Sequence, residues 1–290
     1  MKKTLVAFFT FSFITSFGQA GSEIYLFDLK VKAGQVILSG GVNITNHKGY
    51  DNQPFFHPSK PVIYYSSFND SGRSDIKYYD YKRETTANLT VTNEREYSPT
   101  VTPDEKFISC IIQRDDGAQD LGKYPIKGGD PEVLINDLVI GYHAWTGNNK
   151  LLLFVLGDSG RNTLHYYDLI TKRDTVIANN IGRSLHKVPG INAMSFVQKI
   201  SDKDAVIKTF DLATGKISSV IPALPGQDHL TWLRSDIFLM SDGSKLFACV
   251  IGHEIGWLPV IFEGDITMLK GVTRLAVNIK NTRLAVVVSE

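Results

Sequence analysis

Short runs of apolar and β-branched residues, separated by turns rich in Gly, Pro, Asp and Ser, recur along the whole chain. The clearest stretch, residues 52–90, holds four such runs, at residues 54–56, 62–66, 76–81 and 89–90. Runs of this length and composition, joined by tight turns, predict β-strands in successive hairpins. Four short antiparallel strands make one blade of a β-propeller, so this stretch predicts a blade.

The same pattern is repeated along the chain. Further copies begin at regular intervals, near Tyr97, Tyr142, Leu185, His229 and, for half a copy, Thr273. In the copy that starts at His229, the fourth strand is expected at residues 258–262. Self-similarity at a fixed period indicates one repeat architecture and not several unrelated domains.

The missing half of the last copy is found at the other end of the chain. Residues 23–29 have the pattern of the third strand of a blade, and residues 35–39 follow as a fourth strand. Pairing them with the C-terminal strands at residues 273–279 and 283–288 would remove two exposed sheet edges. We therefore predict an all-β, six-bladed propeller in one domain, residues 21–290, whose last blade is closed by the N- and C-terminal strands.

The repeat resembles a known family. Pro54, the turn His57-Pro58-Ser59-Lys60, the aromatic and Ser run at residues 62–67, the Asp-Ile-Lys-Tyr-Tyr-Asp run at residues 75–80 and the closing Leu89-Thr90 are similar to the WD40-like (PD40) repeat of TolB-type β-propellers. The second copy carries the same signals at Ser98-Pro99 and at residues 102–106. The resemblance implies a six-bladed propeller in an exported bacterial protein.

The N-terminus has the pattern of a secretory signal peptide. Lys2 and Lys3 precede a mostly apolar stretch at residues 5–17, and Gly18-Gln19-Ala20 provides small residues for cleavage after Ala20. We expect residues 1–20 to be removed, no transmembrane segment after cleavage, and a periplasmic or extracellular protein. An uncleaved N-terminal membrane anchor is the alternative.

Composition and motifs narrow the classes of function. Net charge is +1, from 31 basic and 30 acidic residues, and no basic stripe with interleaved aromatics is present, so nucleic acid is not an expected partner. Cys110 and Cys249 fall in different copies of the repeat, and we expect both to be free. No nucleophile elbow, zinc-protease helix, phosphate loop or dinucleotide fingerprint occurs, so the sequence does not favour an enzyme.

The repeat register brings one group of polar residues together. The residues at the start of each innermost strand are spaced by 43 to 45 positions: Gln53, Ser98, His143, His186, His229 and Arg274. Innermost strands all start at the same end of a propeller's channel, so we expect these residues to form one ring at a channel mouth. Tyr97 and Tyr142 are next to it in sequence. Polar groups that converge on a concave surface are typical of a ligand site.

Three interpretations of this ring stay open. The side chains could simply hydrate the channel and satisfy backbone groups at the strand ends. They could bind a ligand, with Arg274 taking an anionic group and the tyrosines stacking on it. They could also hold a divalent transition metal through His143, His186 and His229. Oligogalacturonate lyases, which use similar propeller repeats, have a His-rich metal site of this kind.

From these observations we predict a non-enzymatic binding or scaffold module of the cell envelope. It would be a monomer that needs no cofactor and recognises a protein, a peptide or a glycan. The alternative is a metal-dependent enzyme, a lyase or a lactone hydrolase, that acts on a small molecule at the channel mouth.

Overall fold

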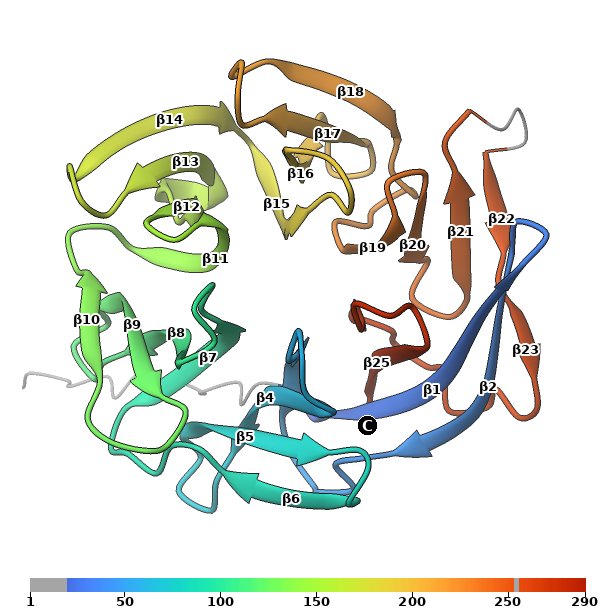
Figure 1. The fold of residues 1–290 in the computed structure, drawn as a ribbon, viewed down its shortest axis with the longest axis horizontal. Coiled ribbons are helices and arrows are strands. Elements are labelled where there is room, and N and C mark those ends of the chain that lie inside the picture. Colours follow the sequence, from blue (N-terminus) through green and yellow to red (C-terminus); the bar gives the residue numbers. More distant parts are fainter. Residues whose placement is uncertain (1–19, 253–255) are drawn as a thin grey trace, which may run out of the picture.

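The computed structural model describes residues 20–252 and 256–290, and in this part of the chain the regular structure is almost entirely β. Six sheets are arranged around a central axis, which confirms the predicted six-bladed propeller (Figure 1). A short 3₁₀ turn at Asp158–Gly160 is the one helical segment among the described residues, and no helix there is long and apolar enough to span a bilayer. The predicted signal peptide, residues 1–20, falls outside the described residues except for Ala20.

Blades 1 to 3 follow each other along the chain, and each has four antiparallel strands with its first strand nearest the axis. Blade 1 consists of β3 (Asp51–Phe56), β4 (Val62–Phe68), β5 (Ser74–Asp80) and β6 (Thr85–Asn88). Blade 2 consists of β7 (Arg95–Val101), β8 (Phe107–Gln113), β9 (Gln119–Pro125) and β10 (Glu132–Ile135). Blade 3 consists of β11 (Ile140–Gly147), β12 (Lys150–Val155), β13 (Thr163–Asp168) and β14 (Arg173–Asn179).

Blades 4 and 5 continue in the same direction round the ring. Blade 4 consists of β15 (Ile181–Lys187), β16 (Ala193–Lys199), β17 (Ala205–Asp211) and β18 (Ile217–Pro222). Blade 5 consists of β19 (Leu230–Arg234), β20 (Ile237–Ser241), β21 (Leu246–Val250) and β22 (Trp257–Pro259).

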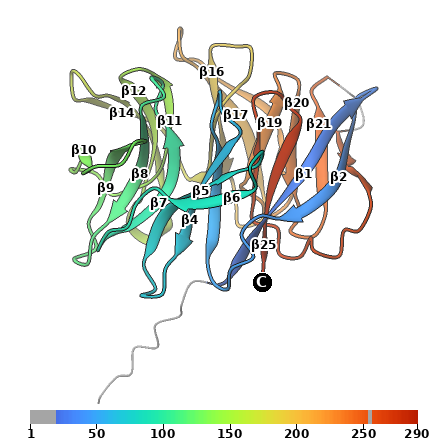
Figure 2. The same cartoon turned by 60° about the horizontal axis from the view of Figure 1, so that its bottom comes forward.

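The two ends of the chain close the ring in blade 6. Its inner strands are β24 (Arg274–Val277) and β25 (Arg283–Ser289), and its outer strands are β1 (Ser22–Lys32) and β2 (Gln35–Asn43). Strand β1 pairs antiparallel with β25 over seven residues, from Ser22 opposite Ser289 to Asp28 opposite Arg283. Figure 2 shows the blue N-terminal strands beside the red C-terminal ones. This pairing confirms the predicted closure.

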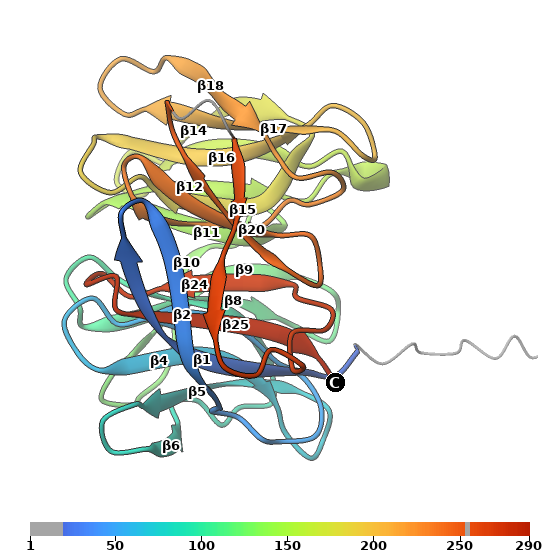
Figure 3. The same ribbon diagram turned by 90° about the vertical axis from the view of Figure 1, so that its right-hand side faces the viewer.

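The structure corrects the predicted fourth strand of blade 5, residues 258–262. Strand β22 ends at Pro259, and β23 (Ile261–Glu263) pairs parallel with β2 of blade 6 (Figure 3). The reason is that β21 begins at Leu246, whose carbonyl accepts a hydrogen bond from Val260 N, so no partner remains in blade 5 for the residues that follow. The chain then crosses to the free edge of β2 and makes blade 6 five-stranded.

Six apolar clusters hold the blades together, and each lies between two neighbouring blades. Between blades 6 and 1, for example, Ile24 and Val287 pack against Ile63, and all three are fully buried. Because every blade buries its faces against two others, the ring depends on all six being present. Cys110 and Cys249 are free and buried in two of these clusters, as predicted.

Candidate ligand-binding channel

The innermost strands surround three cavities that follow one another along the axis. The first mouth, about 630 Å³, lies where these strands start, and the second mouth, about 820 Å³, lies where they end. A waist of about 210 Å³ lies between them. Tyr142, Arg183 and Arg274 line both the first mouth and the waist, whereas Phe55 and Leu185 line both the waist and the second mouth.

All eight of the predicted site residues line this channel, but at several depths and not as one ring. Gln53, Tyr142, His229 and Arg274 line the first mouth and the waist, Tyr97 lines the first mouth, Ser98 lines the waist, and His143 and His186 line the waist and the second mouth. The equal spacing in sequence does not reveal these different depths, because the predicted residues occupy different positions within their strands. Arg274 is the first residue of β24, whereas His186 is the sixth residue of β15.

Gln53 and Ser98 form a hydrogen bond that joins blade 1 to blade 2. Each precedes a proline and has a positive φ, 60° and 56°, at a break in the pairing of its strand. Gln53 Oε1 accepts hydrogen bonds from Ser98 N at 2.6 Å and from Ser66 Oγ at 2.9 Å. With its carbonyl oxygen occupied in this way, Gln53 joins two inner strands.

Arg274 is held in a fixed orientation at the first mouth. Its Nη2 donates a hydrogen bond to Tyr142 Oη at 2.7 Å, and its guanidinium carbon lies 4.9 Å from the centre of the Tyr142 ring. A guanidinium over an aromatic face is attracted by the ring electrons, and a guanidinium keeps further donors for an anion. The pair therefore presents an oriented cation to the cavity.

A second cationic group surrounds Asp228 at the same mouth. Asp228 lies 3.6 Å from Arg183 Nη2, 3.4 Å from Lys199 Nζ and 3.4 Å from His229 Nε2. Burial alone would raise the pKa of Asp228, but His229, Arg183 and Lys199 hold it below its ordinary value. Burial, and then the charge of Arg274, holds the pKa of His229 well below its usual range. One carboxylate is thus shared among several cations.

The sequence did not predict Arg183, Lys199 or Asp228. They come from the start of β15, the end of β16 and the segment before β19, and they follow no shared motif. One available signal was Gly182, next to Arg183. A Cβ at Gly182 would lie 2.6 Å from Asp228 Cβ, so only glycine lets Asp228 approach this closely.

His143 is buried and His186 is half-buried, and each is hydrogen-bonded to a serine. His143 Nε2 lies 2.7 Å from Ser109 Oγ, and His186 Nε2 lies 2.9 Å from Ser184 Oγ. Burial lowers the pKa of His143 to about 3 and that of His186 to about 4, so both rings are uncharged at neutral pH. Within residues 20–252 and 256–290, no three His, Cys, Asp or Glu side chains are grouped closely enough to hold a metal ion. As placed, the three channel histidines do not fit a common metal.

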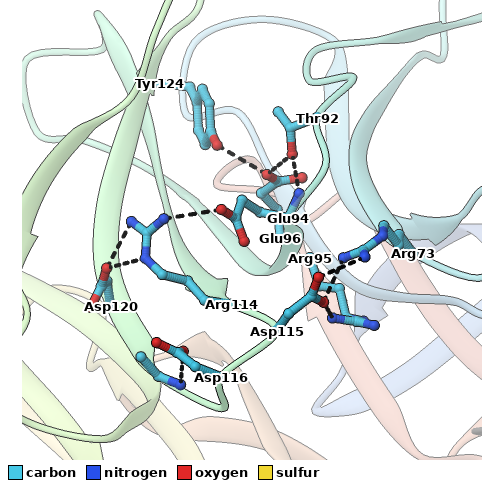
Figure 4. A network of polar contacts seen from close by, with 11 residues as sticks. Arg73, Thr92, Glu94, Arg95, Glu96, Arg114, Asp115, Asp116, Asp120 and Tyr124 are labelled. Atoms are coloured by element: carbon cyan, nitrogen blue, oxygen red, sulfur yellow. Dashed lines mark hydrogen bonds and ion pairs between the residues drawn. The ribbon is translucent and has the colours of Figure 1, made fainter.

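A separate polar network joins blade 1 to blade 2 (Figure 4). Asp115 pairs with Arg73 at 3.0 Å and with Arg95 at 2.9 Å, and the two arginines hold its pKa at about 2. Buried Glu96 accepts hydrogen bonds from Thr92 Oγ1 at 2.6 Å and from Tyr124 Oη at 2.9 Å. Since these groups pair with one another, the network stabilises the contact between blades 1 and 2.

No family model matches the sequence, and the comparison with characterised proteins found no match in sequence. Solved structures do match in fold. The chain is 12% identical to TolB from Acinetobacter baumannii, with a TM-score of 0.59 over 92% of this chain and 63% of TolB, so it spans less than two thirds of that protein.

Two further solved structures match this chain in fold with comparable TM-scores. An oligogalacturonate lyase in complex with manganese is 14% identical, with a TM-score of 0.57 over 86% of this chain and 80% of the lyase. A chain of a nidogen/laminin complex is 10% identical, with a TM-score of 0.63 over 92% of this chain and 98% of the other. Identities this low show a shared propeller fold and nothing about function.

Proposed function

We propose that this protein is an exported, non-enzymatic binding module of the cell envelope, which takes an anionic group of a protein, peptide or glycan into the first mouth. The observation that supports this most is the convergence of Arg274, Arg183 and Lys199 on one open cavity. Of the described residues that line this cavity, only Asp228 has an acidic side chain.

The charge balance favours an anion as the bound group. Arg183 and Lys199 share the Asp228 carboxylate, and Arg274 has no acidic partner among the residues that line this mouth. Burial and the charges of Arg274 and Arg183 hold the pKa of the nearby His229 well below its usual range, so this ring is neutral. An arriving carboxylate or phosphate would complete the pairing of Arg274, whose Tyr142 contact has already fixed the guanidinium. Preorganised arginines lose little freedom on binding, which is why they recur in anion sites.

The size and shape of the mouth suit one group of a larger ligand. A volume of about 630 Å³ lies in the range of known small-ligand sites. Tyr97 and Tyr142 line the same cavity and offer ring faces next to the cations. A peptide or glycan could therefore place one anionic group inside and rest the remainder on the rim.

Export is proposed from the N-terminal sequence, since residues 1–19 lie outside the described part of the chain. The fold shared with TolB agrees with an envelope protein. Mass spectrometry of the protein from a cell-envelope fraction should give a mature chain that begins at Gly21. An intact N-terminal Met1 in that fraction would contradict cleavage after Ala20, and absence of the protein from the envelope fraction would contradict export.

The anion site is tested by calorimetric titration with succinate, a small dicarboxylate. Arg274→Gln and Arg183→Gln should each weaken succinate binding roughly tenfold, because each removes a charge-assisted hydrogen bond. Arg83→Gln is the matched control, since the Arg83 side chain is 82% exposed at a distant turn. Unchanged affinity in both channel variants, with folded protein by circular dichroism, would overturn the proposal.

A further inference from the structure

The charges that line the first mouth do not balance. Asp228 is the one carboxylate that faces Arg183, Lys199 and Arg274 among the described residues of this cavity. Its pKa lies below its ordinary value, so it is ionised at neutral pH, and the neutral ring of His229 adds no charge. The lining therefore carries two more positive charges than negative ones.

The two arginines meet at one hydroxyl group. Tyr142 Oη accepts a hydrogen bond from Arg274 Nη2 at 2.7 Å. Burial would lower the pKa of Arg183, but Asp228 and then Tyr142 raise it above its ordinary value, so the Arg183 guanidinium also lies beside the Tyr142 side chain. Arg183 belongs to β15 of blade 4 and Arg274 to β24 of blade 6, and the fold thus brings both to Tyr142 of blade 3.

His229 indicates the same arrangement from another side. After burial, the charges of Arg274 and Arg183 both lower the pKa of His229. A charge has such an effect only at short range in a solvated cavity. Since Tyr142 and His229 each have both arginines as neighbours, the excess positive charge is concentrated in one part of the mouth.

These donors are open to a ligand. The side chains of Arg183 and Lys199 are 50% and 51% exposed, and Arg274 and Tyr142 are half-buried. The Tyr142 hydroxyl accepts from Arg274 and keeps its own proton as a donor. A ligand in the first mouth therefore meets charged N–H donors and a hydroxyl donor together.

The amount and the concentration of this charge distinguish between anions. A carboxylate or a sulfate ester carries one negative charge, whereas a phosphate monoester carries nearly two at neutral pH, on three oxygen atoms. Carboxylates would need two groups to neutralise an excess of two charges, and a phosphoryl group does so alone. Guanidinium groups also match the geometry of phosphate oxygens.

The rest of the lining favours a sugar as the carrier of the phosphoryl group. Gln113 and Gln119 line the same cavity, and neither side chain makes a hydrogen bond within the described residues. Each amide offers both donors and an acceptor, which is what sugar hydroxyl groups require. Tyr97 adds an aromatic face at this mouth.

We propose that the first mouth binds a phosphorylated sugar of a glycan, whose phosphoryl group lies between Arg183 and Arg274 and accepts a hydrogen bond from the Tyr142 hydroxyl. This inference rests on the proposed function, and it names the anion that the same cavity takes. Tyr142 is a positioning residue for the two arginines as well as a donor to the ligand.

The test compares methyl phosphate with methyl sulfate, which have the same shape and differ by one charge. Each is titrated into the full chain by calorimetry at pH 8, where methyl phosphate is the dianion, since the second pKa of a phosphate monoester is about 6. Methyl phosphate should bind about tenfold more tightly, because it gains a further charge-assisted interaction. Equal affinities would overturn the proposal.

The same pair of probes at pH 5 tests the role of the second charge. Methyl phosphate then carries one charge, so its affinity should fall to that of methyl sulfate. Methyl sulfate keeps its charge, and its affinities at the two pH values therefore report any change in the protein itself. A preference of the same size at pH 5 would contradict recognition of the dianion.

Tyr142→Phe is the matched variant, since it keeps the ring beside Arg274 and removes only the hydroxyl. Its preference for methyl phosphate at pH 8 should fall roughly fivefold, the value of one hydrogen bond. Arg83→Gln, at a side chain that is 82% exposed on a distant turn, should keep the full preference. An unchanged preference in Tyr142→Phe would contradict the proposal, and if that variant does not fold, the comparison at pH 5 decides.

A last pair of probes separates a glycan from a peptide. Glucose 6-phosphate should bind more tightly than an acetylated phosphoserine amide, and the reverse order would overturn the assignment to a sugar. Succinate binding together with equal affinities of the two methyl esters would overturn this inference and leave the proposed function standing. Absence of binding of succinate and of both esters would overturn the two together.

Discussion

Glu96 shows at the scale of one residue how the ring accommodates a buried acid. It is fully buried between blades 1 and 2, and hydroxyl groups surround its carboxylate (Figure 4). Burial raises the pKa of Glu96 above its ordinary value of 4.5, although the hydroxyls of Thr92 and Tyr124 oppose the change. Its protonated form is therefore more favoured in the folded than in the unfolded protein.

Replacing this acid should change how stability depends on pH. Because the pKa is higher in the folded state, the contribution of Glu96 is present below about pH 4.5 and is lost as the pH rises through the folded-state value. Glu96→Gln should thus gain stability over wild type between pH 4 and pH 7, by about 1.4 kcal/mol for each unit of pKa difference. Urea unfolding at both pH values measures this, and parallel profiles for the two proteins would contradict it.

Only some of the residues that line the channel could be predicted from the sequence. Arg274, Tyr142 and His229 could be predicted because they recur in phase with the repeat. Arg183 and Asp228 could not, because their meeting depends on Gly182 and on the register of β15. The serine partner of His143 could not be predicted either, since the Ser109 contact crosses from one blade to the next.

At the scale of elements, β23 is the part of the fold that the sequence pattern described incorrectly. Residues 258–262 read as one strand, yet Val260 is 7% exposed and turns the chain toward blade 6. The position at which β21 begins, Leu246, decides this, and the pattern of one strand carries no information on the length of its partner. The strand gives blades 5 and 6 a second connection besides the core cluster between them.

Weakening β23 should therefore loosen the ring closure. Phe262 packs edge-on against buried Phe27, with ring centres 5.9 Å apart. Phe262→Ala should lower the free energy of unfolding by roughly 2 kcal/mol, because it removes a half-buried aromatic contact. Ile200→Ala, at a side chain that is 67% exposed, is the control and should have little effect. Equal effects of the two substitutions in urea unfolding would show that β23 does not stabilise the closure.

At the scale of the whole molecule, the closed ring makes the stability of each blade depend on the other five. The closure could be predicted because two incomplete copies of one repeat lay at the two ends of the chain. Deleting residues 271–290 removes β24 and β25 and opens the clusters that blade 6 shares with blades 5 and 1. The truncated chain should show no cooperative thermal transition, whereas a transition at the wild-type midpoint would contradict a closed ring.

The two mouths of the channel differ in their lining at the scale of the whole molecule. Arg183, Lys199 and Arg274 line the first mouth with Asp228 as the one acidic residue beside them, whereas the second mouth is lined by aromatic side chains together with charged residues of both signs. The excess of cations at the first mouth is the basis of the proposed function.

The most direct test of that function compares succinate with succinamide, its uncharged analogue, by calorimetry on the wild-type protein at low and high salt. We predict measurable binding of succinate and none of succinamide, with a succinate affinity that falls as salt rises, because the cations of the first mouth are screened. Equal binding of both compounds, or a succinate affinity independent of salt, would contradict an anion site at the first mouth.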